Sequence, residues 1–250
     1  MKKTLGAVAV LALVGACGQQ DEASSQAPTA PPAKFSVETI GAQRETIMEG
    51  KRDGKIVLSA LPEGPGLIAL GPIAGLTGEI TIVDGNVSLA RVGSDGLLQT
   101  SSERDAAAPF LVWADVSGGW AQSDLPTSVQ TIADLEQFVV EQARKAGING
   151  AFPFKVEGAP AKVSIHVLKA DPSMPHPAGM DAHKEIQAHF EIAETPVTFA
   201  GFYSEEHEGV FTHMGAVSHI HTVTFDRSLS GHVESIEFGG GPFKVFLPVT

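Results

Sequence analysis

The chain has 250 residues and carries 29 acidic against 17 basic side chains, a formal net charge of −12 at pH 7. Such an acidic protein has no electrostatic basis for binding nucleic acid, because affinity for phosphates comes mainly from lysine and arginine. The single cysteine excludes disulfide bonds within the chain.

The N-terminus predicts an export signal, residues 1–17. A basic start precedes a short apolar run at 5–14, which is too short for a comfortable membrane span. The run ends in Val-Gly-Ala-Cys17, which resembles a bacterial lipobox and implies lipid attachment to the Cys17 thiol. An ordinary secretory signal with a chance cysteine is the alternative. Gly18 favours an outer-membrane lipoprotein facing the periplasm, with lipid as its only membrane contact.

The sequence then divides into a tether and a folded body. Residues 18–34 are rich in Gln, Ser, Ala and Pro and lack apolar periodicity, which is typical of a flexible linker. Residues 35–250 are long enough for one large domain or two small lobes with a substantial core.

Two segments show helical spacing of apolar residues. The first, 35–50, places Val37, Ile40 and Ile47 near one face and ends at a glycine. The second runs from about Thr127 to Ala146. Ser128 or Thr131 can cap it, and Gly147 can close it.

Most of the remaining body predicts β-strands. The clearest pair, 79–83 and 87–92, flanks Asp84-Gly85-Asn86, a hairpin signal. Further strands are expected at 110–113, 151–156, 161–168 and 197–203, and a long loop at 170–184. The predicted class is α+β, predominantly β, with two packed mixed sheets or lobes and few helices.

The most specific pattern is a group of three histidines near the C-terminus. His219 and His221 are two residues apart in a predicted strand, so their side chains share a face. If the following hairpin is symmetric about Asp226-Arg227, His221 lies opposite His232 on the next strand. Three converging imidazoles would suit Zn²⁺ with an open position. A one-residue bulge would turn His232 away, and three unrelated strand histidines are the alternative.

Several segments together resemble the zinc-dependent α-acetolactate decarboxylases, in family order across most of the body. They are Gly71-Pro-Ile-Ala-Gly-Leu-Thr-Gly-Glu79, Phe152-Pro-Phe-Lys-Val-Glu-Gly158, Gly201-Phe-Tyr203, His219-Ile-His221 and Ser230-Gly-His232. The resemblance implies that family's fold, with His219, His221 and His232 as zinc ligands and Glu79 as an active-site carboxylate. It also implies a small 2-hydroxy-3-keto acid as the substrate. The resemblance is also compatible with a homodimer.

The chain departs from the family pattern in four places. His166 stands where the family has an arginine, and Pro242 where it has a glutamate near the C-terminus. Thr77 replaces an aspartate, and the stretch between Tyr203 and His219 is slightly longer than the family pattern. The first two changes affect groups that would handle substrate.

The resemblance implies zinc-dependent decarboxylation of 2-acetolactate to acetoin. Glu79 would carry a proton, and protonated His166 would replace the arginine as the partner of the substrate carboxylate. Glu79 could instead be a solvated carboxylate, and His166 a core or surface histidine. We expect the histidines at 176, 183, 189, 207 and 213 to be solvated, and the alternative is that one of them joins a second site. A non-catalytic or repurposed zinc-binding lipoprotein of the same fold is the alternative function.

Overall fold

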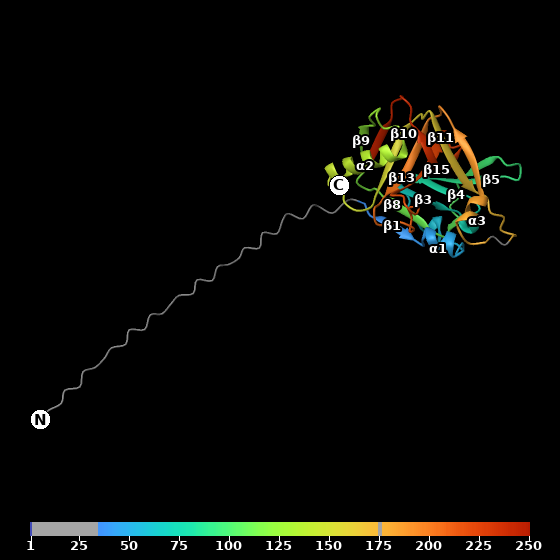
Figure 1. Ribbon diagram of the computed structural model, residues 1–250, viewed down its shortest axis with the longest axis horizontal. Coiled ribbons are helices and arrows are strands. Elements are labelled where there is room, and N and C mark those ends of the chain that lie inside the picture. Colours follow the sequence, from blue (N-terminus) through green and yellow to red (C-terminus); the bar gives the residue numbers. More distant parts are fainter. Residues whose placement is uncertain (2–34, 175–176) are drawn as a thin grey trace. The chain divides into compact units, whose positions relative to one another are not determined.

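The computed structural model describes Met1, residues 35–174 and residues 177–250. The predicted signal peptide, Cys17 and the linker therefore lie outside the described residues. All secondary structure discussed below belongs to a single compact unit (Figure 1). Among the described residues, no helix is both long and apolar enough to cross a membrane.

Two β-sheets form the framework of the described chain. The smaller sheet has six strands in the order β1-β8-β3-β4-β5-β6. Their bounds, in that order, are Val37–Ile40, Leu111–Asp115, Leu67–Pro72, Glu79–Val83, Asn86–Val92 and Leu98–Ser101. A separate two-stranded ribbon pairs β2 (Ile56–Val57) with β7 (Ala107–Ala108). The short 3₁₀ helices η1 (Leu58–Ala60) and η2 (Ala74–Leu76) lie in the connections of this half.

The larger sheet has eight strands in the order β12-β11-β15-β14-β13-β10-β16-β9. Their bounds are Gln187–Ile192, Lys162–Leu168, Ser230–Glu237, Ser218–Thr224, Val197–Tyr203, Phe152–Gly158, Lys244–Pro248 and Trp120–Asp124. The helices are α1 (Gln43–Met48), α2 (Ile132–Lys145) and α3 (Met180–Glu185). This mostly β architecture with few helices confirms the predicted class.

The two sheets pack face to face through alternate side chains of their strands. Ile68 and Leu70 of β3 share a buried cluster with Phe202 of β13 and Val223 of β14. Intervening residues such as Ile80 and Ile82 point to the opposite face of the smaller sheet. The inner face of β4 therefore turns toward the larger sheet, and this arrangement positions the site described below.

Helix α2 covers the outer face of the larger sheet, where Leu135 and Val139 join a cluster with Phe152 and Phe154 (Figure 1). Thr131 is the N-cap, and its side chain and that of Asp134 form a capping box. Of the two predicted caps, the structure selects Thr131.

Three expectations from the sequence need correction. Residues 35–50 are not one helix: β1 pairs with β8, and Gly41 at φ +66° separates β1 from α1. The sheets are not mixed, because every pairing between the named strands is antiparallel. Antiparallel pairing is expected where connections are short and helices are few, because parallel strands need long crossover connections. Finally, the predicted loop 170–184 ends in the short helix α3.

The core between the sheets should dominate stability. Phe202 is fully buried and meets Phe211 edge to face, with ring centroids 6.2 Å apart. Phe202→Ala should lower the free energy of unfolding by about 3–5 kcal/mol, because a large cavity would remain. The matched control Phe225→Ala removes a ring that is 58% exposed and should change it by at most about 0.5 kcal/mol. Urea titration of both variants measures this difference, and equal losses would contradict the assigned core.

Candidate metal centre

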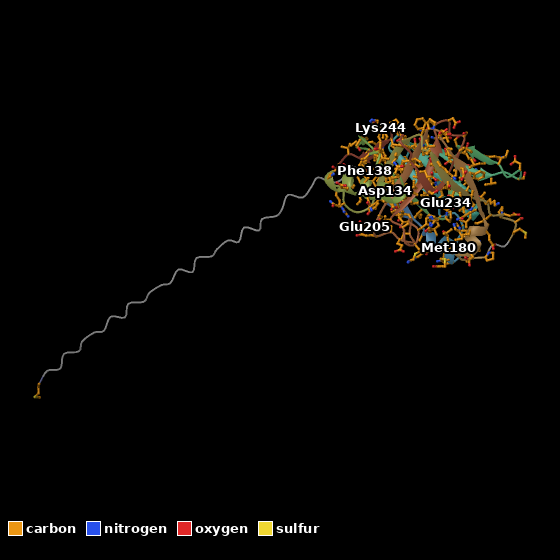
Figure 2. All side chains as sticks on the ribbon, turned by 45° about the horizontal axis from the view of Figure 1, so that its top comes forward. Asp134, Phe138, Met180, Glu205, Glu234 and Lys244 are labelled. Carbon is orange, nitrogen blue, oxygen red and sulfur yellow. The ribbon has the colours of Figure 1, made fainter. Side chains whose placement is uncertain are left out.

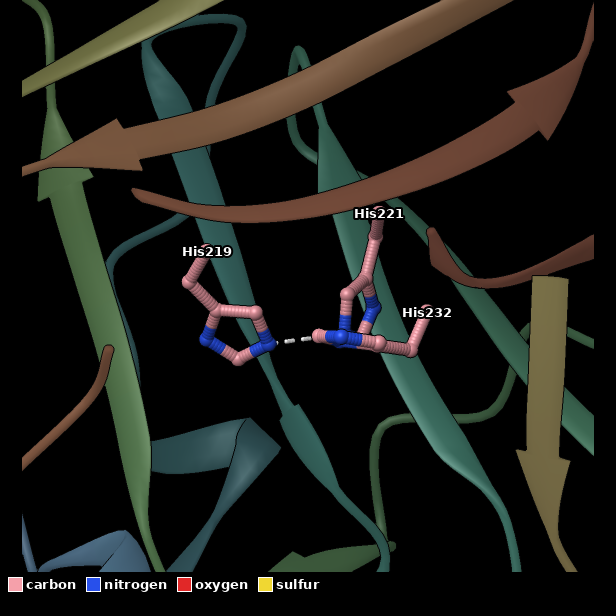
Figure 3. A group of neighbouring side chains, drawn as sticks. All are labelled: His219, His221 and His232. Carbon is pink, nitrogen blue, oxygen red and sulfur yellow. Dashed lines mark hydrogen bonds between the residues drawn. The ribbon is translucent and has the colours of Figure 1, made fainter. Parts of the chain in front are cut away.

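Strands β14 and β15 bring three histidines together. His221 lies opposite His232 in the antiparallel ladder, which confirms the predicted hairpin register. His219 shares the face of His221, and their Nε2 atoms are 3.0 Å apart. One ligand atom from each of the three rings lies within 4.8 Å of the others. Figure 3 shows the three rings turned toward one another.

The cluster is buried between the two sheets. His219, His221 and His232 are 3%, 0% and 8% exposed. Burial lowers the pKa of all three rings, that of His221 to about 3, so they are neutral near pH 7. Thr81 Oγ1 of β4 lies 3.0 Å from His221 Nδ1, which leaves Nε2 to face the cluster. Neutral imidazole nitrogens around one point are a donor set that fits zinc.

Glu79, at the start of β4, lies beside this cluster. Its side chain is buried, and Oε2 is 3.8 Å from His221 Nε2. Burial raises the pKa of Glu79 well above its ordinary value, although a hydrogen bond from the Leu168 backbone lowers it. The alternative of a solvated carboxylate is therefore wrong, and burial favours the protonated form of Glu79.

His166 of β11 also faces the cluster. It is 5% exposed, and its ring centroid is 4.6 Å from that of His232. Glu234 contacts both His166 Nδ1, at 3.2 Å, and His189 Nδ1, at 3.0 Å. The hydrogen bond with His166 is the largest cause that lowers the pKa of Glu234, to about 2. Glu234 lies at the domain surface (Figure 2), so the contact links the buried site to solvent. The catalytic role of His166 stays a prediction.

The structure adds residues that sequence reasoning did not place at the site. Contrary to expectation, His213 and His183 are not solvated. His213 Nε2 lies 3.2 Å from His232 Nε2, and His183 is 5% exposed. Burial lowers the pKa of His213 to about 4. Gln43 of α1 contacts the His213 ring. One sign of this additional histidine was present in the sequence: the stretch before His219, which carries His213, is longer than the family pattern.

The remaining histidines lie elsewhere. His189 is exposed and contacts Glu234, and His207 contacts Ser204 Oγ at 2.7 Å. His176 lies outside the described residues. Pro242 lies in the connection between β15 and β16.

The cavity at the cluster is small. It measures about 20 Å³ and is lined by Gln43, Glu79, apolar side chains and five histidines: His166, His183, His213, His219 and His232. A space of this size holds about one water molecule. A second cavity of about 400 Å³ shares His213 and His232 with the first and continues past Glu234 toward α2.

A family model described as alpha-acetolactate decarboxylase matches residues 41–246, which include every strand except β1 and the last residues of β16, and all three histidines of the cluster. The chain belongs to the alpha-acetolactate decarboxylase family. Comparison with curated protein sequences yields no significant match.

Solved structures of family proteins share the fold of this alpha-acetolactate decarboxylase family member. A Staphylococcus aureus protein, described as of unknown function and similar to alpha-acetolactate decarboxylase, is 17% identical with a TM-score of 0.68. That match covers 84% of each chain. The alpha-acetolactate decarboxylase of Bacillus subtilis strain 168 is 18% identical with a TM-score of 0.66, over 84% of this chain and 85% of that one. The acetolactate decarboxylase of Bacillus subtilis subspecies spizizenii is 18% identical with a TM-score of 0.65, over the same shares.

Proposed function

We propose that the protein is a zinc-dependent carboxy-lyase that converts 2-acetolactate to acetoin and CO₂. The observation that carries this proposal is the buried Glu79 beside three neutral histidines, in a member of the alpha-acetolactate decarboxylase family. The histidine nitrogens supply ligands, and the carboxyl group supplies a proton carrier.

His219, His221 and His232 would hold the zinc ion. When bound, zinc would act as a Lewis acid toward the ketone and hydroxyl oxygens of a 2-hydroxy-3-keto acid. Because all three ligands are neutral, they would leave the full positive charge of the ion for the substrate.

Glu79 would provide the proton that completes the reaction. Loss of CO₂ from acetolactate leaves an enediolate, and acetoin forms when the carbon that carried the carboxylate gains a proton. The raised pKa of Glu79 favours the protonated form that this role needs. The surrounding burial excludes bulk water from competing for the transfer.

His166 would receive the substrate carboxylate in place of the family's arginine. Nδ1 would donate a hydrogen bond to Glu234, which fixes the ring, and in the protonated ring that this role requires Nε2–H would remain to donate to the substrate carboxylate. One N–H grips a carboxylate less strongly than the two parallel donors of a guanidinium. We therefore expect weaker substrate binding than an arginine would provide.

The decisive experiment is to incubate zinc-loaded protein with racemic 2-acetolactate and to follow CO₂ and acetoin. We expect both products in equal amounts, and neither above the spontaneous rate after the metal is removed by a chelator. A zinc-loaded protein without turnover would favour the second candidate.

That second candidate is a non-catalytic or repurposed zinc-binding protein. It is supported by His166 and Pro242, which replace groups expected to handle substrate, and by the small cavity at the cluster. In this case zinc would bind with the same three ligands, but acetolactate would be neither bound nor consumed.

We further propose that the protein is an envelope lipoprotein, anchored at Cys17 and exposed to the periplasm. The proposal rests on the lipobox-like Val-Gly-Ala-Cys17 after a short apolar run. The tether at 18–34 would then separate the folded domain from the membrane.

The anchor predicts a clear labelling result. The wild type should incorporate radiolabelled palmitate and fractionate with membranes, because the thiol of Cys17 is the only one in the chain. Cys17→Ser should incorporate no label and accumulate as the unprocessed precursor. A wild type that is never acylated would exclude the lipoprotein assignment.

A further inference from the structure

The loop between β13 and β14 carries a fourth histidine to the cluster. His213 Nε2 lies 3.2 Å from His232 Nε2, and the ring meets those of His232 and His219 edge on, with centroids 4.8 and 6.2 Å away. The side-chain nitrogen of Gln43, in α1, lies 3.0 Å from His213 Nδ1. The same nitrogen lies 3.2 Å from His213 Nε2, and Gln43 is itself 5% exposed, so a buried amide holds the ring in place.

The loop is anchored on one side of His213 and exposed on the other. Phe211 is buried in the inter-sheet core, and the backbone N–H groups of Gln43 and Arg44 donate to the carbonyl oxygens of Val210 and Gly209. Directly after His213, Met214 is 68% exposed and Gly215 has φ +80°. His213 thus sits where a fixed segment meets a surface turn, and such a position allows the ring to move without disturbing the core.

The nitrogen spacing around the cluster is that of metal ligands. Two nitrogens bound to one tetrahedral zinc at a bond length of about 2.05 Å lie about 3.3 Å apart. The Nε2 atoms of His219 and His221 are 3.0 Å apart, and those of His213 and His232 are 3.2 Å apart. Two pairs of Nε2 atoms at the cluster, one of which includes His213, therefore have the spacing of ligands on one metal ion.

We propose that His213 is a fourth, exchangeable ligand of the metal held by His219, His221 and His232. The proposal rests on metal binding at this cluster and concerns this chain's own loop. With His213 bound, the site has four protein ligands and is closed, as structural zinc sites are. With His213 released, it has three ligands and an open position, as catalytic zinc sites have.

Exchange of His213 would also control how substrate reaches the metal, because His213 lines two cavities. His213 and His232 line both the inner cavity of about 20 Å³ and the outer cavity of about 400 Å³. A five-carbon hydroxy acid does not fit a space that holds about one water. Movement of the His213 ring would join the cavities and free a coordination position in a single step, so a chelating hydroxy acid would enter by displacing His213.

The test counts ligands with Co²⁺ and measures zinc affinity by chelator competition, using the full-length protein. His213→Ala should weaken zinc binding by at least about 10-fold, the loss seen when even an outer partner of a metal ligand is removed. It should also weaken the visible Co²⁺ absorption, which is strong for four-coordinate cobalt and weak for higher coordination by added water. His207→Ala is the matched control, because it removes a ring from the same loop that contacts Ser204 and Phe211 instead of the cluster.

A second variant gives a positive signal. His213→Cys should produce a thiolate-to-Co²⁺ charge-transfer band in the near ultraviolet, whereas His207→Cys should not. The band would identify position 213 directly, even if the alanine variant folds poorly. Affinity and spectra unchanged by His213→Ala, or zinc binding that becomes tighter, would overturn the proposal, the latter because His213 would then be blocking His232. If the wild type binds no metal at all, metal binding at the cluster is itself wrong.

Binding of a stable 2-hydroxy acid supplies the readout for exchange. Lactate should bind more tightly to zinc-loaded His213→Ala than to the zinc-loaded wild type, because it no longer competes with the imidazole. Equal lactate affinity would show that His213 does not leave the metal, and would overturn the exchange.

Discussion

Replacing His219, His221 or His232 singly with alanine is expected to abolish stoichiometric zinc binding and, with it, decarboxylase activity. Each ring supplies a buried, neutral nitrogen to the cluster, and without it the site keeps only two of these rings and the exchangeable His213, which we expect to be too few to retain zinc through purification. Elemental analysis of the purified proteins should give about one zinc per wild-type chain and none in the three variants.

The same variants should lose the stabilisation that metal provides. A ligand present at about 100 times its dissociation constant stabilises the folded state by about 2.7 kcal/mol. For a chain of this size that corresponds to roughly 5–10 °C in Tm. Zinc should therefore raise the Tm of the wild type by this amount and leave that of His219→Ala unchanged.

His189→Ala is the matched control for the three ligand variants. His189 is exposed and contacts Glu234 without reaching the three-histidine cluster. It should retain both the zinc and the zinc-dependent rise in Tm. Retention of zinc in all three ligand variants would disprove the site, whatever their activity.

Glu79→Gln is expected to separate proton transfer from metal binding. Glutamine has nearly the same shape but cannot deliver a proton, and Glu79 is not among the three ligands. We expect kcat to fall by about 100-fold or more, the usual contribution of general acid–base catalysis, while zinc content stays near one per chain.

Glu63→Gln is the control for this change, since Glu63 is an exposed carboxylate that does not line the cavity at the cluster. It should leave kcat unaltered. If Glu79→Gln retained full activity with zinc bound, the proton would come from another group, and the proposed role of Glu79 would be abandoned. If the variant lost zinc as well, Glu79 would act on the metal site instead of on the proton.

Local sequence patterns predicted the parts of the fold that depend on hydrogen bonds between residues close in the chain. The hairpin at Asp84-Gly85 has both residues at positive φ, as the turn signal requires. Thr131 and Gly147 bound α2 as expected. The pairing of His221 with His232 followed from turn symmetry alone, because an antiparallel ladder without a bulge keeps a constant sum of residue numbers.

The same local rules failed where a distant strand competed for the backbone. The apolar spacing at 35–50 is compatible with a helix, but residues 37–40 form hydrogen bonds with β8 instead. Whether such a segment forms a helix or an edge strand depends on which strand is available to pair with it. The pairing strand here, β8, is more than 70 positions away in the chain. The apolar spacing within the segment therefore does not predict which of the two structures forms.

By itself, the sequence determined the three-histidine face, because two adjacent strands and one turn are enough to build it. Only the tertiary structure decided what surrounds that face. Packing of the two sheets placed Glu79 and Thr81 against His221. Pairing of β11 with β15 set His166 opposite His232, and the loop between β13 and β14 carried His213 in. These contacts depend on which sheet faces are buried against each other, a property of the whole core. Burial is also what raises the pKa of Glu79 and lowers those of the histidines, so the chemistry of the site appears only once the sheets have closed over it.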